Sequence, residues 1–200
     1  MTPASTSEVE PLACAVFIVG AFILSGAAHV LWLRSAASRR FGFPIDCGFS
    51  LNGKRIFGDH KMLRGFVVMI PATGAAFFLL SAAARVAASE FAARLWTASP
   101  WQYAALGAWA GFGFMAGELP NSFMKRQLNI PPGGMPAHSF TRFICFVADR
   151  IDSILGMLAA LSVVVFVPAM TWIYVIVAGA GIHWTFSVAL FAFGVKERMA

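Results

Sequence analysis

The strongest constraint on this 200-residue chain is a series of long apolar segments. A helix needs about 20 apolar residues to cross a bilayer core of about 30 Å. The stretches that reach or approach this length are residues 12–33, 66–88, 101–117, 150–167 and 171–194. We therefore predict an all-α, polytopic membrane protein with about five transmembrane helices, forming a single transmembrane domain over residues 1–200.

The composition supports a membrane protein and excludes a soluble one. Hydrophobic residues make up 59% of the chain and charged residues only 12%. A soluble domain carries about 25% charged residues, so this chain has too few to cover a water-facing surface. The net charge of +6 does not indicate a nucleic-acid partner, because little soluble mass remains to carry a basic face. We expect a multi-pass protein of the inner (cytoplasmic) cell membrane.

The distribution of basic residues predicts the orientation in the membrane. Most Lys and Arg residues lie in two long loops, 34–65 and 118–150, and in the C-terminal tail, whereas Arg85 and Arg94 lie on the opposite side. Loops rich in Lys and Arg stay in the cytoplasm. We therefore expect the N-terminus outside, the C-terminus in the cytoplasm, and both long loops on the cytoplasmic face.

The first polar cluster lies in residues 58–65, where the second apolar segment begins. Lys61 and Arg64 are one helical turn apart, and the start of the helix offers free backbone N–H groups. This arrangement suits a polyphosphate. The alternative interpretation is that Lys61 and Arg64 anchor the helix to lipid headgroups. The cluster alone leaves both interpretations open.

The second polar cluster belongs to the loop 118–150 and the segment that follows it. Asp149 and Asp152 are three residues apart, so both carboxylates project from one face of a helix. A charge at membrane depth costs about 2.5–3.5 kcal/mol, and two like charges also repel each other unless a cation lies between them. Mg²⁺ suits such a pair of carboxylates. Alternatively, Asp149 simply caps a helix.

Taken together, the two clusters indicate a class of chemistry. Carboxylates and Lys/Arg pairs in two loops on the same side are the groups used in metal-assisted phosphoryl or nucleotidyl transfer. Other signatures are absent: the sequence has no G-x-S-x-G or H-E-x-x-H motif, and its three cysteines lie far apart. The P-loop-like stretch that starts at Gly48 has Arg55 where Ser or Thr is required.

Three stretches of the chain resemble the motifs of a known enzyme family. They are Pro44-Ile45-Asp46 followed by residues 52–66, then Ser122–Arg126, and finally Asp149–Gly156. In order and spacing they are similar to the CDP-archaeol synthases, a family of CTP-dependent lipid-phosphate cytidylyltransferases. The last stretch also resembles the related phosphatidate cytidylyltransferases. Three positions depart from the family pattern: His60 replaces Gly, Met62 replaces Thr, and Glu118 stands where Asp is typical.

The resemblance implies a Mg²⁺-dependent transfer of CMP from CTP to a membrane lipid phosphate, archaetidic- or phosphatidic-acid-like, with release of pyrophosphate. The expected metal ligands are Asp149 and Asp152, supported by Asp59 and Glu118. The expected ligands of the CTP phosphates are Lys61, Arg64, Ser122, Lys125 and Arg126. We expect catalysis to depend most on Asp149, Asp152, Lys61 and Lys125.

Alternatives remain at the level of the sequence. A non-catalytic membrane scaffold or transporter, whose basic loops bind anionic lipid headgroups, has a similar charge pattern. Ether-linked and ester-linked lipids differ in tails that any apolar groove accepts, so the sequence does not distinguish them. The G-x-x-x-G spacing of Gly107 and Gly111 usually marks close helix packing, and the same face is one place for a homodimer.

Overall fold

The computed structural model describes residues 9–131, 134 and 138–192, with side chains up to residue 182. The C-terminal tail used in the charge argument lies outside the described residues. Five long helices dominate: α1 (Pro11–Arg34), α2 (Leu63–Ala87), α4 (Pro100–Gln127), α5 (Ser139–Val164) and α6 (Ala169–Ala192). The shorter elements are a 3-10 helix (Ala37–Phe41), β1 (Ser50–Leu51), β2 (Lys54–Arg55) and α3 (Ser89–Ala92). The prediction of a mostly helical protein is confirmed.

Local sequence sets where the helices begin. The carboxylate of Glu10 accepts hydrogen bonds from the main-chain N–H groups of Leu12 (3.0 Å) and Ala13 (2.6 Å), which caps α1. Ser99 and Gln102 form a reciprocal capping box at the start of α4. Both helices also begin with a proline. Proline has no N–H, which costs nothing in the first turn because N–H groups there have no carbonyl partner within the helix.

Small residues bring α4 into backbone contact with both α2 and α5. A Cβ atom on Gly111 would lie 2.6 Å from the carbonyl oxygen of Met69, and one on Gly113 would lie 2.7 Å from that of Gly156. Side chains larger than hydrogen at these positions would force the helices apart. The Gly107/Gly111 face is buried against α2, so the G-x-x-x-G spacing marks close helix packing within the chain.

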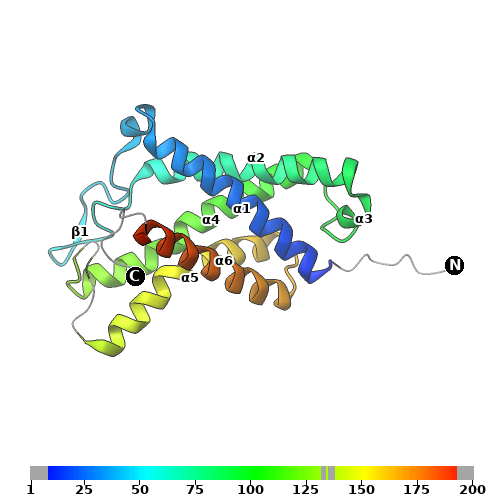
Figure 1. Ribbon diagram of the computed structural model, residues 1–200. Helices are drawn as coiled ribbons and strands as arrows, with labels where there is room; N and C mark the ends of the chain where they lie inside the picture. Colours follow the sequence, from blue (N-terminus) through cyan, green and yellow to red (C-terminus); the bar gives the residue numbers. More distant parts are fainter. Residues whose placement is uncertain (1–8, 132–133, 135–137, 193–200) are drawn as a thin grey trace.

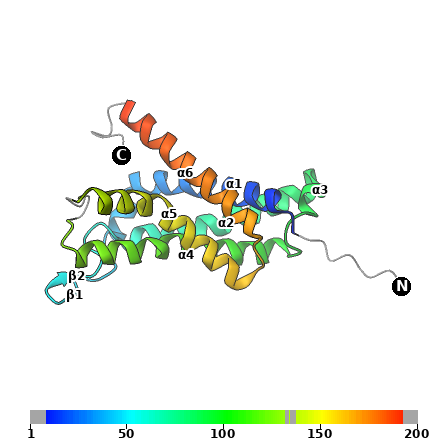
Figure 2. The same ribbon diagram turned by 90° about the horizontal axis from the view of Figure 1, so that it is seen from below.

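The two ends of the bundle differ in chemistry. Figure 1 shows β1, the end of α4 and the start of α5 at one end, and α3 at the other, and Figure 2 shows the same separation after a quarter turn. The α3 end is closed by aromatic residues: Trp96 Nε1 donates to the carbonyl of Phe166 (2.8 Å), and Tyr103 Oη donates to that of Trp96 (2.8 Å). The opposite end carries the polar clusters.

The predicted loop 118–150 is wrong in its extent. Helix α4 continues to Gln127 and α5 already begins at Ser139, so the connection is much shorter. Both helices continue into this region, where their polar residues pair with each other across the α4–α5 interface. The loop 34–65 is also structured, with a 3-10 helix and the β1–β2 hairpin.

Two of the five predicted spans meet a length-and-hydropathy criterion for crossing a membrane. Among the described residues these are α1 and α2, while α6 contributes a shorter apolar segment, Ala169–Ile182. Helix α5 falls short because Asp149, Arg150 and Asp152 interrupt its apolar stretch. Helix α4 falls short already in its uncharged half, which is rich in Gly and Trp.

Candidate active site

A polar cluster joins α4, α5 and the residues just before α2. Lys61, two residues before α2 begins, forms an ion pair with Glu118 on α4. Ser153 on α5 donates a hydrogen bond to the other oxygen of Glu118 (2.8 Å). Glu118 therefore connects segments that are far apart in the sequence, at the polar end of the bundle.

The two aspartates predicted to bind metal lie side by side on α5 and face α4. A single nitrogen, Nδ2 of Asn121, lies 2.7 Å from Oδ1 of Asp149 and 2.9 Å from Oδ2 of Asp152. Lys125, one helical turn after Asn121 on α4, forms an ion pair with Asp149. Two of the predicted lysines and three of the predicted carboxylates thus lie in one place: Lys61, Lys125, Glu118, Asp149 and Asp152. Opposite orientations of Asp149 and Lys125 would have excluded a shared site.

Close contact between the helix backbones brings these side chains together. A Cβ atom on Gly117 would lie 2.5 Å from the carbonyl oxygen of Asp152 and 2.8 Å from Cα of Gly156. Because neither glycine has a side chain, Glu118 on α4 reaches Ser153 on α5, whose hydroxyl also lies 3.4 Å from Oδ1 of the adjacent Asp152. Backbone contact between α4 and α5 is therefore part of the site.

Residues 43–63, which we call the Asp46 loop, lead into α2 and carry Lys61. The side chain of Asp46 is 0% exposed. It accepts hydrogen bonds from Arg55 Nη2 (2.6 Å) and from the main-chain N–H groups of Gly48 (3.1 Å), Phe57 (3.0 Å) and Gly58 (3.0 Å). Burial by itself raises the pKa of Asp46, but these hydrogen bonds outweigh it, so the pKa lies well below its usual value.

The two ends of the Asp46 loop are bonded to each other. The N–H of Ile45 donates to the carbonyl of Lys61 (2.8 Å), and that of Leu63 donates to the carbonyl of Phe43 (2.9 Å). The hairpin in the loop is attached to α4, because Lys54 Nζ donates to the carbonyl of Gln127 (2.5 Å). The position of Lys61 is thus determined by the bonds between the two ends of the loop and by the bond that joins the hairpin to α4.

Not every predicted site residue joins the cluster. Asp59, predicted as a supporting metal ligand, pairs with Arg55 (2.8 Å) and its side chain is 71% exposed. Among the described contacts, none links Asp59 to Glu118, Asp149 or Asp152. Ser122 is buried on α4, and the Nε atom of Arg126 is buried without a hydrogen-bond partner in the described structure.

Two members of the cluster, Asn121 and Ser153, were not predicted from the sequence. Asn121 lies three residues after Glu118 and four before Lys125, so helical spacing places all of them on one face of α4. That spacing is the available signal, and the prediction of a loop over residues 118–150 obscures it.

The donor set suits a hard divalent cation only in part. Within the described part of the chain, no group of three or more His, Cys, Asp or Glu side chains is arranged to hold a metal ion. Asp149 and Asp152 nevertheless place an oxygen each within 3 Å of one nitrogen, so two carboxylates point at a common position. Magnesium is commonly held by one or two carboxylates together with substrate phosphates.

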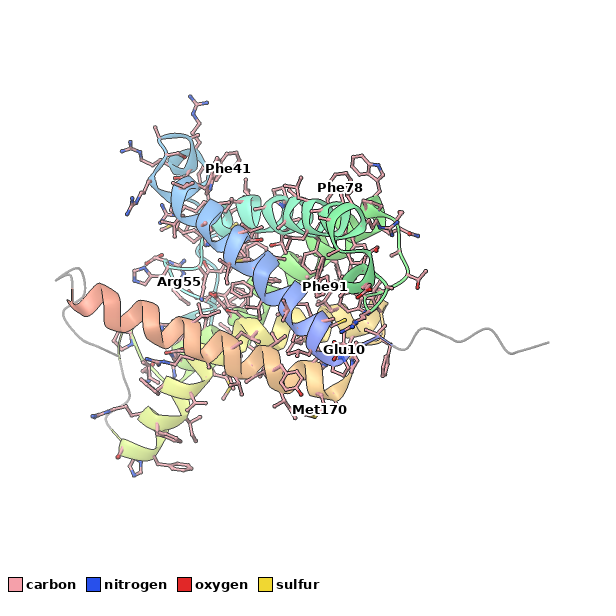
Figure 3. The ribbon with its side chains drawn as sticks, turned by 45° about the vertical axis from the view of Figure 1, so that its right-hand side comes forward. Glu10, Phe41, Arg55, Phe78, Phe91 and Met170 are labelled. Atoms are coloured by element: carbon pink, nitrogen blue, oxygen red, sulfur yellow. The ribbon has the colours of Figure 1, made fainter. Side chains whose placement is uncertain are left out.

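A cavity of about 760 Å³ opens beside the polar cluster. Helices α1 and α6 meet where Thr171 Oγ1 donates to the carbonyl of Pro11 (3.0 Å), and they diverge toward the hairpin end (Figures 1 and 2). Most of the lining is apolar, from α1, α5 and α6, but Glu118, Asp149 and Ser153 line its polar end. In Figure 3, Arg55 lies at the opposite end of the bundle from Glu10 and Phe91.

Comparison with known proteins agrees with this geometry. The family model for CarS-like CDP-archaeol synthases matches residues 15–199. The chain belongs to this family. The CDP-archaeol synthase of Halobacterium salinarum is 34% identical over 163 residues, which cover 78% of this chain and 83% of the relative. That of Methanopyrus kandleri is 30% identical over 159 residues, covering 78% and 79%. As a member of the CDP-archaeol synthase family, the chain is a membrane transferase of lipid biosynthesis.

A solved structure supports the fold. It is described as an intramembrane enzyme for archaeal membrane lipid biosynthesis and matches with a TM-score of 0.60. The match covers 87% of this chain and 92% of that chain at 22% sequence identity. The arrangement of helices described above is therefore shared with that enzyme.

Proposed function

We propose that this protein is a cytidylyltransferase that moves CMP from CTP to the phosphate of a membrane lipid, releasing pyrophosphate. The observation that carries the proposal is the convergence of Lys61, Glu118, Lys125, Asp149 and Asp152 beside an apolar cavity. A nucleotide phosphate and a lipid phosphate need such neighbouring polar and apolar environments. The names of the relatives, CDP-archaeol synthases, support the same reaction.

We assign Mg²⁺ to the carboxylates of Asp149 and Asp152, with Glu118 as a supporting ligand. All three offer oxygen atoms, which magnesium prefers. Bound there, the ion would neutralise charge on the phosphates of CTP. Asp59 is left out of this ligand set because it pairs with Arg55 at the surface.

Lys61 and Lys125 bind the triphosphate in this proposal and stabilise the leaving pyrophosphate. Each ammonium group already reaches a carboxylate of the cluster, so each is within reach of a phosphate bound at the same position. Arg64, Ser122 and Arg126 add further hydrogen bonds. The buried, unpartnered Nε of Arg126 supports its part in binding an anion.

The reaction does not require a protein nucleophile. The phosphate of the lipid is already ionised and attacks the α-phosphorus of CTP, while pyrophosphate leaves on the opposite side. The protein contributes the alignment of both substrates and the neutralisation of charge. A site rich in Lys and Asp is suited to alignment and charge neutralisation.

The cavity holds the chains of the lipid in this proposal, and its polar end holds the phosphate. Its volume of about 760 Å³ lies in the range of ligand pockets, about 300–1,000 Å³. We place the site at the cytoplasmic face of a multi-pass protein of the cell membrane, because the basic loops predict that side and CTP is cytoplasmic.

The test is transfer of labelled CMP by the purified, detergent-solubilised protein. A panel of ether-linked and ester-linked lipid phosphates is offered with CTP and Mg²⁺, and the CDP-lipid is measured. We expect product from the wild type and none from Asp152→Asn, with both proteins equally helical by circular dichroism. Glu90→Gln, which changes an exposed carboxylate on α3, is the matched control and retains turnover.

Two results would contradict the proposal. The first is a wild-type protein that transfers CMP to none of the lipid phosphates and binds no CTP in the presence of Mg²⁺, as a scaffold would behave. The second is full turnover by Asp152→Asn, which would remove the carboxylate assignment.

A further inference from the structure

The polar end of the cavity contains two groups that the proposed reaction has not used, His29 and Arg150. They come from different helices, α1 and α5. Glu118 and Asp149 line the same end, so a phosphate that enters the cavity meets negative charge there. A phosphate held at this position needs donors of its own.

His29 is an ionisable residue in the apolar helix α1. Between Ala15 and Leu33 it is the only titratable residue in an otherwise apolar helix. Its ring is half-buried, lines the cavity and lies within electrostatic range of Glu118 and Arg64. Ionisable residues within membrane helices are costly and mark functional sites by default. Among the described residues, no hydrogen bond engages the ring.

Arg150 is a cation that lines the cavity from α5. Its guanidinium stacks over the ring of Phe146, 3.4 Å from the centroid, and Nη1 donates to the carbonyl of Phe146 (2.9 Å). Its Nε atom is buried without a partner, and within the described chain it forms no ion pair. Lys61 and Lys125 differ, because both are paired with carboxylates.

We propose that His29 and Arg150 bind the phosphate of the acceptor lipid, an inference that rests on the proposed function. The apolar lining receives the chains, and the two donors hold the headgroup at the edge of the metal-binding carboxylates. Lys61 and Lys125 then bind the phosphates of CTP, while His29 and Arg150 bind the phosphate of the acceptor lipid. The two substrates are recognised by separate sets of residues on separate walls of the site.

The experiment compares the two Michaelis constants in His29→Ala, His29→Asn, His29→Gln and Arg150→Gln. KM for the lipid phosphate is measured in mixed micelles at saturating CTP, and KM for CTP at saturating lipid. Loss of a hydrogen bond to a charged group corresponds to roughly tenfold or more in affinity. We expect His29→Ala and Arg150→Gln to raise the lipid KM by about tenfold and to leave the CTP KM within about twofold.

The conservative variants separate hydrogen bonding from packing. Asn and Gln present an amide N–H near the positions of the two ring nitrogens, and we expect one of them to recover most of the lipid affinity. The matched control is His138→Ala, which removes an exposed histidine outside the cavity and leaves both constants unchanged. Equal increases in both Michaelis constants, or no increase in the lipid KM, would overturn the proposal.

A second measurement does not depend on turnover. Thermal stabilisation of the protein by a lipid phosphate is compared with that by the same lipid lacking the phosphate, without CTP, because a ligand stabilises in proportion to its binding. We expect the phosphate-dependent increase in Tm to disappear in His29→Ala and persist in His138→Ala. An undiminished increase in His29→Ala would refute the inference. Absence of CMP transfer by the wild type would refute the proposed function alone.

Discussion

Replacing Asp46 by Asn should make the Asp46 loop open more often while the helix bundle stays folded. The carboxylate accepts main-chain hydrogen bonds from Gly48, Phe57 and Gly58, in addition to its bonds with Arg55. These contacts are local to residues 43–63, whereas α4 packs on α2 and α5 through its glycines. The variant therefore tests whether one buried side chain organises the segment that carries Lys61.

The magnitude follows from the three main-chain donors. A hydrogen bond to a charged acceptor contributes about 1.5–3 kcal/mol, and one to a neutral acceptor about 0.5–1.5 kcal/mol. Asn keeps a neutral oxygen for Phe57 and Gly58, which share Oδ2, but turns an N–H₂ group toward Gly48. The loss of stability sums to about 3–5 kcal/mol for the loop, or roughly two to four orders of magnitude in its opening equilibrium.

Hydrogen exchange read by mass spectrometry measures this opening in detergent solution. We expect peptides from residues 43–63 to exchange at least about a hundredfold faster in Asp46→Asn, and peptides from α4 to exchange as in the wild type. CMP transfer should fall as well, because Lys61 is bonded to Ile45 at the base of the loop. The measurement thus separates local opening from global unfolding.

Asp59→Asn is the matched control, because Asp59 pairs with the same arginine but is 71% exposed. Exposed ion pairs contribute little, so exchange of the loop should rise by no more than about fivefold. The reasoning is refuted if Asp46→Asn also stays within that limit. It is refuted equally if α4 loses as much protection as the loop.

Three further predictions follow from the geometry. Because the pKa of Asp46 is lower than in the unfolded chain, its contribution to loop stability is complete above about pH 4 and is lost as pH falls through the lowered value. Cleavage within residues 43–63 by pepsin, which is active in acid, monitors this opening, and a loop already open at about pH 5 would contradict it. Gly117→Ala should lower Tm by several degrees and reduce turnover, since overpacking costs about 1–3 kcal/mol, whereas Gly26→Ala, where a Cβ meets nothing within 4 Å, should leave Tm unchanged. Removal of divalent cations with EDTA should stop CMP transfer and added Mg²⁺ should restore it, with no change in helical content by circular dichroism; turnover that persists in EDTA would remove the metal from the mechanism.

Much of the fold was predictable because apolar length alone indicates a membrane helix. The segment predicted at 12–33 corresponds to α1, Pro11–Arg34, and the one at 66–88 to α2, Leu63–Ala87. The family resemblance was also confirmed, by the family model over residues 15–199 and by the relatives. It was predictable because the order of its motifs along the chain is visible without a structure.

The continuation of α4 and α5 through their polar halves was not predictable from hydropathy. Charged residues in this region looked like a water-facing loop, but Asn121 and Lys125 on α4 satisfy Asp149 and Asp152 on α5. Such pairing depends on which helices are neighbours, and that information is absent from a local window. The role of Asp46 was missed for a different reason: most of its partners are main-chain N–H groups between Gly48 and Gly58, and such donors leave no signal in the sequence.

The bonds that join the two ends of the Asp46 loop have a practical consequence for its tip. Asn52 and Gly53 form an exposed turn with positive φ angles (52° and 77°), between β1 and β2. Main-chain bonds at Ile45 and Leu63 close the loop between this turn and the start of α2. A peptide tag or a fluorophore inserted between Asn52 and Gly53 would therefore report on the protein in a living membrane without disturbing the chemistry at the base of the loop.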